Sequence, residues 1–138
     1  MTVDGPRISR ASIWTGRVLS GLVIAFTVLD GTMKLIPLSQ VMEAQQGLGF
    51  ANSTGLARAL GVVLLGCTAL YAIPRTALLG AVLLTGFLGG SMAIHLRVGS
   101  PLFTHVLFGF YVGILLWMGL FLRSQSARRL LPWSRAGE

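Results

Sequence analysis

The chain has 138 residues, of which 54% are hydrophobic and only 11% carry a charge, whereas a soluble globular domain has about 25% charged residues. This composition excludes a soluble domain and predicts one membrane domain over residues 1–138 that contacts the lipid bilayer. The net charge of +7 does not indicate nucleic-acid binding, because most basic residues lie at the termini or in one short turn: Arg7, Arg10, Arg17, Arg75, Arg123, Arg128, Arg129 and Arg135.

Four long apolar runs follow one another along the chain, and each predicts a transmembrane helix. A membrane span needs about 20 apolar residues, and proline and glycine mark the breaks between the runs. With their flanks, the predicted spans are 14–37, 55–73, 75–97 and 102–123. A membrane β-barrel would show short alternating runs instead. We therefore predict an all-α integral membrane four-helix bundle with up-down-up-down topology.

Residues 38–54 form the only sizeable predicted loop, between the first and second spans. Pro37 ends the first span, and residues 41–46 predict a short interfacial helix that Gly47 and Gly49 stop. The stretch Asn52-Ser53-Thr54 matches a glycosylation sequon. The same residues also fit a polar turn that caps the second span, and we favour that interpretation.

The distribution of lysine and arginine predicts the orientation of the chain in the membrane. Eight basic residues lie on the side that holds both termini and the turn at 74–75, and three lie on the other side: Lys34, Arg58 and Arg97. Cytoplasmic segments carry the excess of basic residues. We therefore predict that both termini are cytoplasmic and that the loop 38–54 is on the outer side.

Two pairs of glycines, each four residues apart, lie on the third and fourth predicted spans. They are Gly86 with Gly90, and Gly109 with Gly113. Small residues at this spacing let membrane helices approach closely. The pairs predict helix packing, either within the chain or between the copies of a homo-oligomer.

Ionisable residues gather at the predicted outer end of the bundle. Asp30 and Lys34 are one helical turn apart and can pair. Asp30 lies about 10 Å along the helix from Pro37, at a depth where an unpaired carboxylate costs about 2.5–3.5 kcal/mol. We therefore predict that Asp30 faces the bundle interior near His95 or Arg97. The whole predicted cluster is Asp30, Lys34, Glu43, Arg58, His95, Arg97 and His105.

Three interpretations of this polar cluster stay open. It can be a structural clasp that ties helix ends together, or a pocket for a small amphipathic molecule or a quinone head, with Asp30 or His95 as hydrogen-bonding partner. The third is metal or haem ligation by His95 and His105, which no carboxylate-rich spacing supports, so we predict no metal site. We predict no catalytic residues either, because the sequence has no nucleophile elbow and no phosphate loop.

Several stretches of the chain resemble the DoxX-like proteins. The run GGSMAIHLRVG at 89–99, followed by Pro-Leu-Phe at 101–103, is the most specific of them. The others are residues 16–22, 30–34, 48–50, 71–77 and 80–86. In all, the resemblance covers about residues 14–132.

The resemblance implies a small four-helix protein of the bacterial inner membrane. The family takes its name from a subunit of thiosulfate:quinone oxidoreductase, which implies an accessory or quinone-proximal subunit of a membrane redox system, with redox enzyme subunits as partners. It also implies Asp30, Lys34, His95 and Arg97 as the polar positions, and many relatives have a glutamate near the position of Leu64, which implies an altered function here. Two alternatives to a redox subunit stay open: a binding or transport module for a small amphipathic ligand, and a structural or assembly partner.

Overall fold

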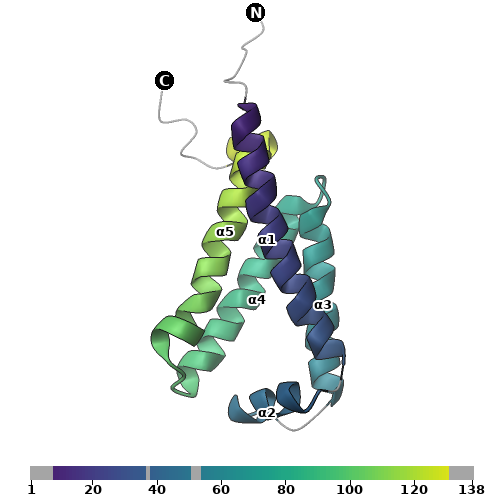
Figure 1. The fold of residues 1–138 in the computed structure, drawn as a ribbon, viewed down its shortest axis with the longest axis vertical. Helices are drawn as coiled ribbons and strands as arrows, with labels where there is room; N and C mark the ends of the chain where they lie inside the picture. Colours follow the sequence, from purple (N-terminus) through teal and green to yellow (C-terminus); the bar gives the residue numbers. More distant parts are fainter. Residues whose placement is uncertain (1–7, 37, 51–53, 131–138) are drawn as a thin grey trace, which may run out of the picture.

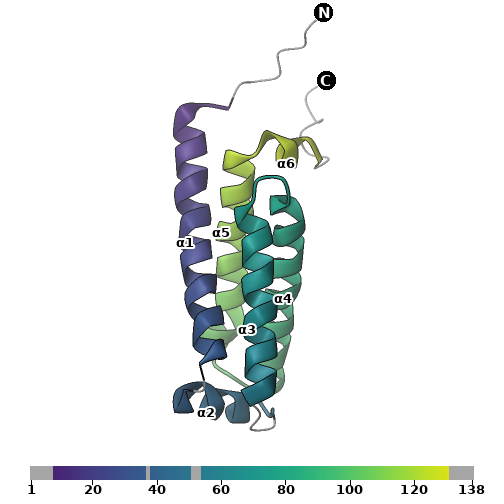
Figure 2. The same cartoon turned by 90° about the vertical axis from the view of Figure 1, so that its right-hand side faces the viewer.

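The computed structural model describes residues 8–36, 38–50 and 54–130. Every regular element within these ranges is a helix, so the predicted all-α fold is confirmed (Figure 1). Four helical segments are long and apolar enough to cross a membrane. They are α1 (Arg10–Leu35), α3 (Thr54–Ala72), α4 (Ala77–Arg97), and the π-helix η1 (Leu102–Val106) continued by α5 (Leu107–Arg123). The short helices α2 (Ser39–Gly47) and α6 (Gln125–Leu130) lie at opposite ends of the bundle (Figure 2).

Local chemistry explains where these helices begin and end. α1 begins at Arg10, earlier than predicted, because the hydroxyl of Ser9 accepts a hydrogen bond from the Ser12 amide at 3.1 Å. Between α3 and α4, the hydroxyl of Thr76 donates to the Leu70 carbonyl at 2.8 Å. The short helix predicted in the loop is present as α2. The predicted alternatives for Asn52 and Ser53 lie outside the described residues.

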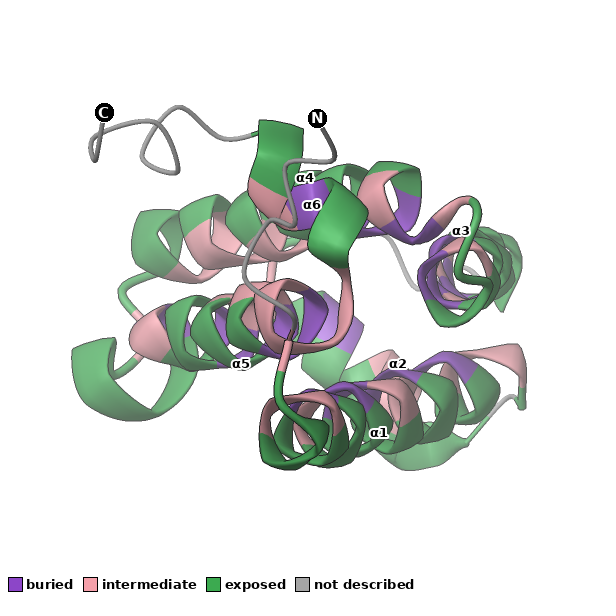
Figure 3. Cartoon of the chain, turned by 90° about the horizontal axis from the view of Figure 1, so that it is seen from above, coloured by how far each residue is buried: buried purple, intermediate pink, exposed green. Residues whose placement is uncertain are grey.

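Successive long helices run in alternating directions (Figure 2), and seen from above the four form a ring (Figure 3). α1 packs against α3 and α5, and α4 packs against the same two helices. Figure 3 shows the buried positions on the sides of the helices that face one another and the exposed positions on their outer faces. Large exposed side chains such as Trp14, Leu22 and Phe110 cover those outer faces. The chain is thus a small multi-pass membrane protein with an apolar surface for lipid.

At the end of the bundle that carries α6, here called the α6 end, α1 meets α5 closely and α3 meets α4 closely. A Cβ at Gly16 of α1 would lie 2.6 Å from the Arg123 amide nitrogen of α5, and a Cβ at Gly80 of α4 would lie 2.5 Å from the Tyr71 Cα of α3. Only glycine permits such backbone contacts. The α1–α5 and α3–α4 contacts therefore close this end.

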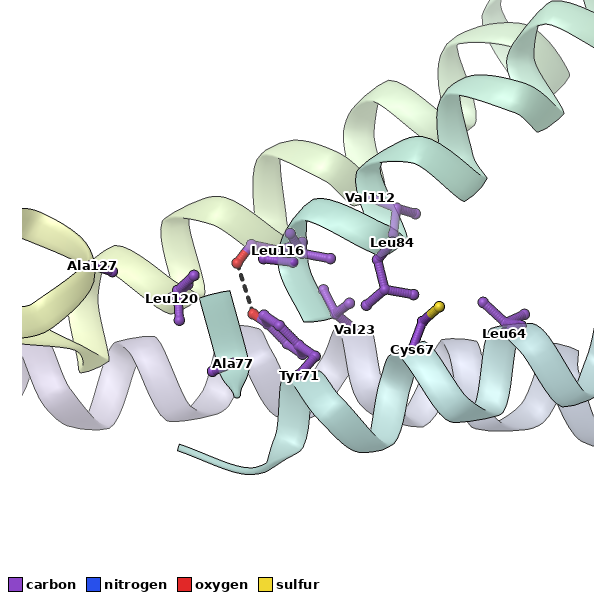
Figure 4. Close-up of a cluster of buried hydrophobic side chains, with 11 residues drawn as sticks. Val23, Leu64, Cys67, Tyr71, Ala77, Leu84, Val112, Leu116, Leu120 and Ala127 are labelled. Carbon is purple, nitrogen blue, oxygen red and sulfur yellow. Dashed lines mark hydrogen bonds between the residues drawn. The ribbon is translucent and has the colours of Figure 1, made fainter. Parts of the chain in front are cut away.

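A buried core fills the α6 end and is centred on Tyr71, which is 0% exposed (Figure 4). The Tyr71 hydroxyl donates to the Leu116 carbonyl of α5 at 2.7 Å. Because its single proton is used there, the hydroxyl of Ser20 in α1 donates to the Tyr71 oxygen at 3.0 Å. Tyr71 thus joins three helices.

At the opposite end, here called the α2 end, the helices stay close only within two pairs. A Cβ at Gly61 of α3 would lie 2.8 Å from the Gly31 carbonyl oxygen of α1, and a Cβ at Gly109 of α5 would lie 2.8 Å from Met92 of α4. The buried residues of α4 all lie in its first half, from Ala77 to Leu84. The α1–α3 pair and the α4–α5 pair therefore separate toward the α2 end, as Figure 1 shows.

The predicted packing glycines behave differently from expectation. Gly109 contacts α4, but a Cβ at Gly86, Gly90 or Gly113 would meet no atom within 4 Å. The prediction is therefore wrong for these three residues as contacts within the chain, because they lie on faces that do not meet another helix. Their use between copies of the chain stays a prediction.

Candidate functional site

The separation of the two helix pairs leaves a cavity of about 860 Å³ at the α2 end. Binding sites for small molecules occupy about 300–1,000 Å³. α2 lies across this end of the bundle (Figure 1), and residues from every helix except α6 line the cavity. At its α6 side the cavity stops at the packed core described above. The site is therefore a blind pocket within the described part of the chain.

Four of the seven residues in the predicted polar cluster line this cavity. They are Asp30, Lys34, His95 and His105. As predicted, Asp30 forms an ion pair with Lys34 one turn away, and it shares the cavity with His95. The fold thus brings these four residues, which come from α1, α4 and η1, to one cavity.

The two histidines form a small polar group at the junction of α4 and η1. Their ring centroids lie 5.7 Å apart. The Nδ1 atom of His95 is 3.1 Å from the Ser100 hydroxyl, and the Nδ1 atom of His105 is 2.8 Å from the Thr104 hydroxyl. The Nε2 atom of each ring has no hydrogen-bond partner among the described residues, so it is available to a ligand as donor or acceptor.

The other three predicted residues lie outside the cavity lining. Glu43 on α2 and Arg58 on α3 are both exposed. Arg97 reaches the turn after α2, where its guanidinium lies 3.1 Å from the position of a Cβ at Gly49. Gly49 has a φ of 80°, which glycine adopts without strain. Arg97 therefore packs against the end of α2 and not against a ligand site.

Gln45 of α2 lines the cavity and was missed by the sequence analysis. Its side chain is buried, with the residue 6% exposed, and neither its Nε2 nor its Oε1 atom has a hydrogen-bond partner among the described residues. Most buried polar atoms in proteins are paired. The sequence could not predict the burial of Gln45, because the same short polar helix could equally well be fully solvated.

The rest of the cavity wall is mainly apolar. Phe26 of α1 and Phe108 of α5 meet edge to face, with ring centroids 5.1 Å apart, and Leu60 and Ile94 line other parts of the wall. Polar side chains at one end and an apolar wall below them fit a molecule with a polar head and an apolar body.

Metal binding has less support from the described residues. Among them, no group of three or more His, Cys, Asp or Glu side chains lies in an arrangement that could hold a metal ion. His95 and His105 are adjacent but bring no third ligand of these types.

Comparison with known proteins agrees with the fold. The family model described as the DoxX-like family matches residues 18–119. This range includes α2, α3, α4 and η1 completely and most of α1 and α5. No curated protein and no solved structure matches the chain significantly.

Proposed function

We propose that this chain, which belongs to the DoxX-like family, binds a small amphipathic molecule in the cavity at the α2 end. The observation that carries the proposal is a cavity of about 860 Å³ with ionisable and amide side chains at one end and an apolar wall below. The ligand places its polar head near His95, His105 and the Asp30–Lys34 pair. Its apolar body contacts the phenylalanines.

The closed α6 end favours a binding function over passage across the membrane. Tyr71, Leu84 and Leu116 are each 0% exposed and fill the bundle below the cavity. An interior packed in this way does not let a small molecule pass unless the helices rearrange. The proposal therefore assigns the cavity to retention or presentation of a ligand from one side.

Replacing His95 by alanine is expected to reduce the ligand that the purified protein retains. The loss of one hydrogen-bonding ring, with a ligand polar atom left unpaired, is worth about 1–3 kcal/mol, or about fivefold or more in retention. The measurement is solvent extraction of protein purified in mild detergent, followed by mass spectrometry and normalisation to protein. Glu43→Gln is the control, because Glu43 is exposed and lies outside the cavity. Equal retention in His95→Ala and wild type would contradict the proposal.

Gln45→Met separates ligand binding from a structural role by the sign of its effects. If the Gln45 amide pairs only with a ligand, the methionine variant is expected to retain less ligand and yet be more stable once the ligand is removed. The gain is about 1–3 kcal/mol, the cost of a buried unpaired amide. Thermal unfolding of delipidated protein measures it. A less stable apo variant would show that the amide serves the fold.

The redox interpretation is one specific form of this proposal, and it rests on the family resemblance. The residues present fit a quinone head, because the imidazoles of His95 and His105 and the amide of Gln45 can each donate to a carbonyl oxygen. A bound quinone would supply electron-transfer chemistry to a partner enzyme. A quinone in the extract, together with redox subunits retained in native mass spectrometry, would establish the accessory role.

We also propose a bacterial inner-membrane location with both termini in the cytoplasm. In a Cys67→Ala background, cysteine introduced at Glu43 is expected to react with an impermeant maleimide in intact spheroplasts, and cysteine introduced at Arg75 only after permeabilisation. Cys67 is the single cysteine of the sequence, so its removal leaves no other thiol to react. This labelling pattern is expected because basic residues are in excess on the Arg75 side, and such segments stay in the cytoplasm. Labelling of the Arg75 position in intact spheroplasts would reverse the orientation.

A further inference from the structure

The second half of α4 presents bare backbone to the cavity. Gly86 and Gly90 lie one turn apart, and both line the cavity. A Cβ at either residue would meet no atom within 4 Å, so no neighbouring helix in this chain requires a glycine there. Glycine inside a helix costs about 0.5–1 kcal/mol relative to alanine. The two missing side chains therefore widen the cavity at a cost to the helix.

The depth of this widening can be located along the helix. Gly90 and Gly86 precede His95 by five and nine residues, which corresponds to about 7.5 Å and 13.5 Å. Phe26 lies one turn before Asp30, and Phe108 lies three residues after His105. The wide part of the cavity therefore begins next to the polar side chains, on the side toward the α6 end, at the level of the Phe26 and Phe108 rings.

The charges at the polar end favour an uncharged head. Among the described residues that line the cavity, Asp30 carries the only carboxylate and Lys34 the only ammonium group, and the two neutralise each other as an ion pair. Arg58 and Arg97 do not line the cavity. A phosphate or carboxylate head would need unpaired cationic groups of the arginine or lysine type.

We infer that Gly86 and Gly90 determine the size of the ligand, and that the ligand is an uncharged amphiphile with a ring-sized body directly below its polar head. This inference rests on the proposed binding function. A straight chain leaves the space beside the two glycines unfilled and loses the contacts that a ring makes there. The glycines thus act as specificity-determining residues.

The test uses two uncharged alcohols with the same number of carbon atoms, trans-4-pentylcyclohexanol and undecanol. The first carries a ring next to its hydroxyl, and the second is unbranched. Saturation binding of the tritiated alcohols to the full chain in lipid nanodiscs is measured against protein-free nanodiscs. The variants are Gly86→Leu and Gly90→Leu, with Gly89→Leu as control, because Gly89 lies outside this cavity and its Cβ would also meet no atom within 4 Å.

We expect the wild-type protein to bind the cyclic alcohol about tenfold more tightly than undecanol. Leucine at 86 or 90 is expected to weaken the cyclic alcohol about tenfold and undecanol far less, while Gly89→Leu binds both as wild type does. If a leucine variant does not purify as a single species, the alanine variant at the same position replaces it, with a smaller expected loss.

Three outcomes would overturn the inference in distinguishable ways. Equal binding of the two alcohols by the wild type, or unchanged binding in both leucine variants, would refute the role of the glycines and leave the binding function standing. A changed oligomeric state of the leucine variants with unchanged affinity would assign the glycines to contacts between copies. No saturable binding of either alcohol, with nothing retained in the extraction experiment, would refute the proposed function as well.

Discussion

Replacing Gly80 by alanine is expected to destabilise the bundle by about 3 kcal/mol or more, because overpacking against rigid atoms is costly. The added Cβ would lie 2.5 Å from the Tyr71 Cα, closer still to the Tyr71 amide nitrogen, and 2.7 Å from the Leu70 carbonyl carbon. These are backbone atoms of α3 and cannot move aside as the end of a flexible side chain can. The α3–α4 pair must therefore separate at the α6 end. Thermal unfolding in detergent measures the loss.

Gly86→Ala is the matched control on the same helix. Its Cβ meets no atom within 4 Å, so the variant is expected to gain about 0.5–1 kcal/mol from the higher helix propensity of alanine. The same chemical change thus has opposite signs six residues apart. Equal stability of the two variants would mean that α3 and α4 are not in contact at Gly80.

The contrast between these glycines explains what the sequence could predict. Helices were predictable because their signals are local: long apolar runs, and prolines such as Pro74 that break them. The face that a membrane helix turns to its neighbours has no such signal, since lipid is as apolar as the bundle core. Spacing indicated two glycine pairs, Gly86 with Gly90 and Gly109 with Gly113, and of these only Gly109 makes a close contact within the chain. The other close contacts are made by glycines that spacing did not indicate: Gly16, Gly31, Gly61, Gly80 and Gly119.

The candidate site was predictable where the membrane imposes a cost. Asp30 and Lys34 interrupt an apolar run, so an ionisable side chain there needed a partner and an interior position, and both line the cavity. Glu43, in the short helix α2, and Arg58, near the start of α3, are both exposed, so neither charge required an interior position. Gln45 was missed for the same reason, because the burial of α2 depends on the splay of helices distant in sequence.

The α6 end offers a second large effect at Tyr71. Tyr71→Ala is expected to cost about 3–5 kcal/mol, the range for loss of a buried aromatic side chain. The residue is 0% exposed, its ring lies 4.9 Å from the Arg123 guanidinium carbon, and its hydroxyl joins α3 to α5 and α1. Unfolding of the variant in detergent measures the cost, and a loss below about 1 kcal/mol would contradict the assigned core.

Tyr71→Phe isolates the hydroxyl from the ring. The ring contacts stay, and the loss is expected to fall to about 0.6–1.7 kcal/mol, the range for hydrogen bonds between membrane helices. Ser20→Ala removes the hydroxyl that donates to Tyr71 from α1. Because both changes break the same hydrogen bond, the double variant should be less destabilised than the sum of the two single variants. Strict additivity would mean that Ser20 and Tyr71 do not interact, and that other contacts, such as the hydrogen bond from the Ser12 hydroxyl to the Leu122 carbonyl, hold α1 at this end.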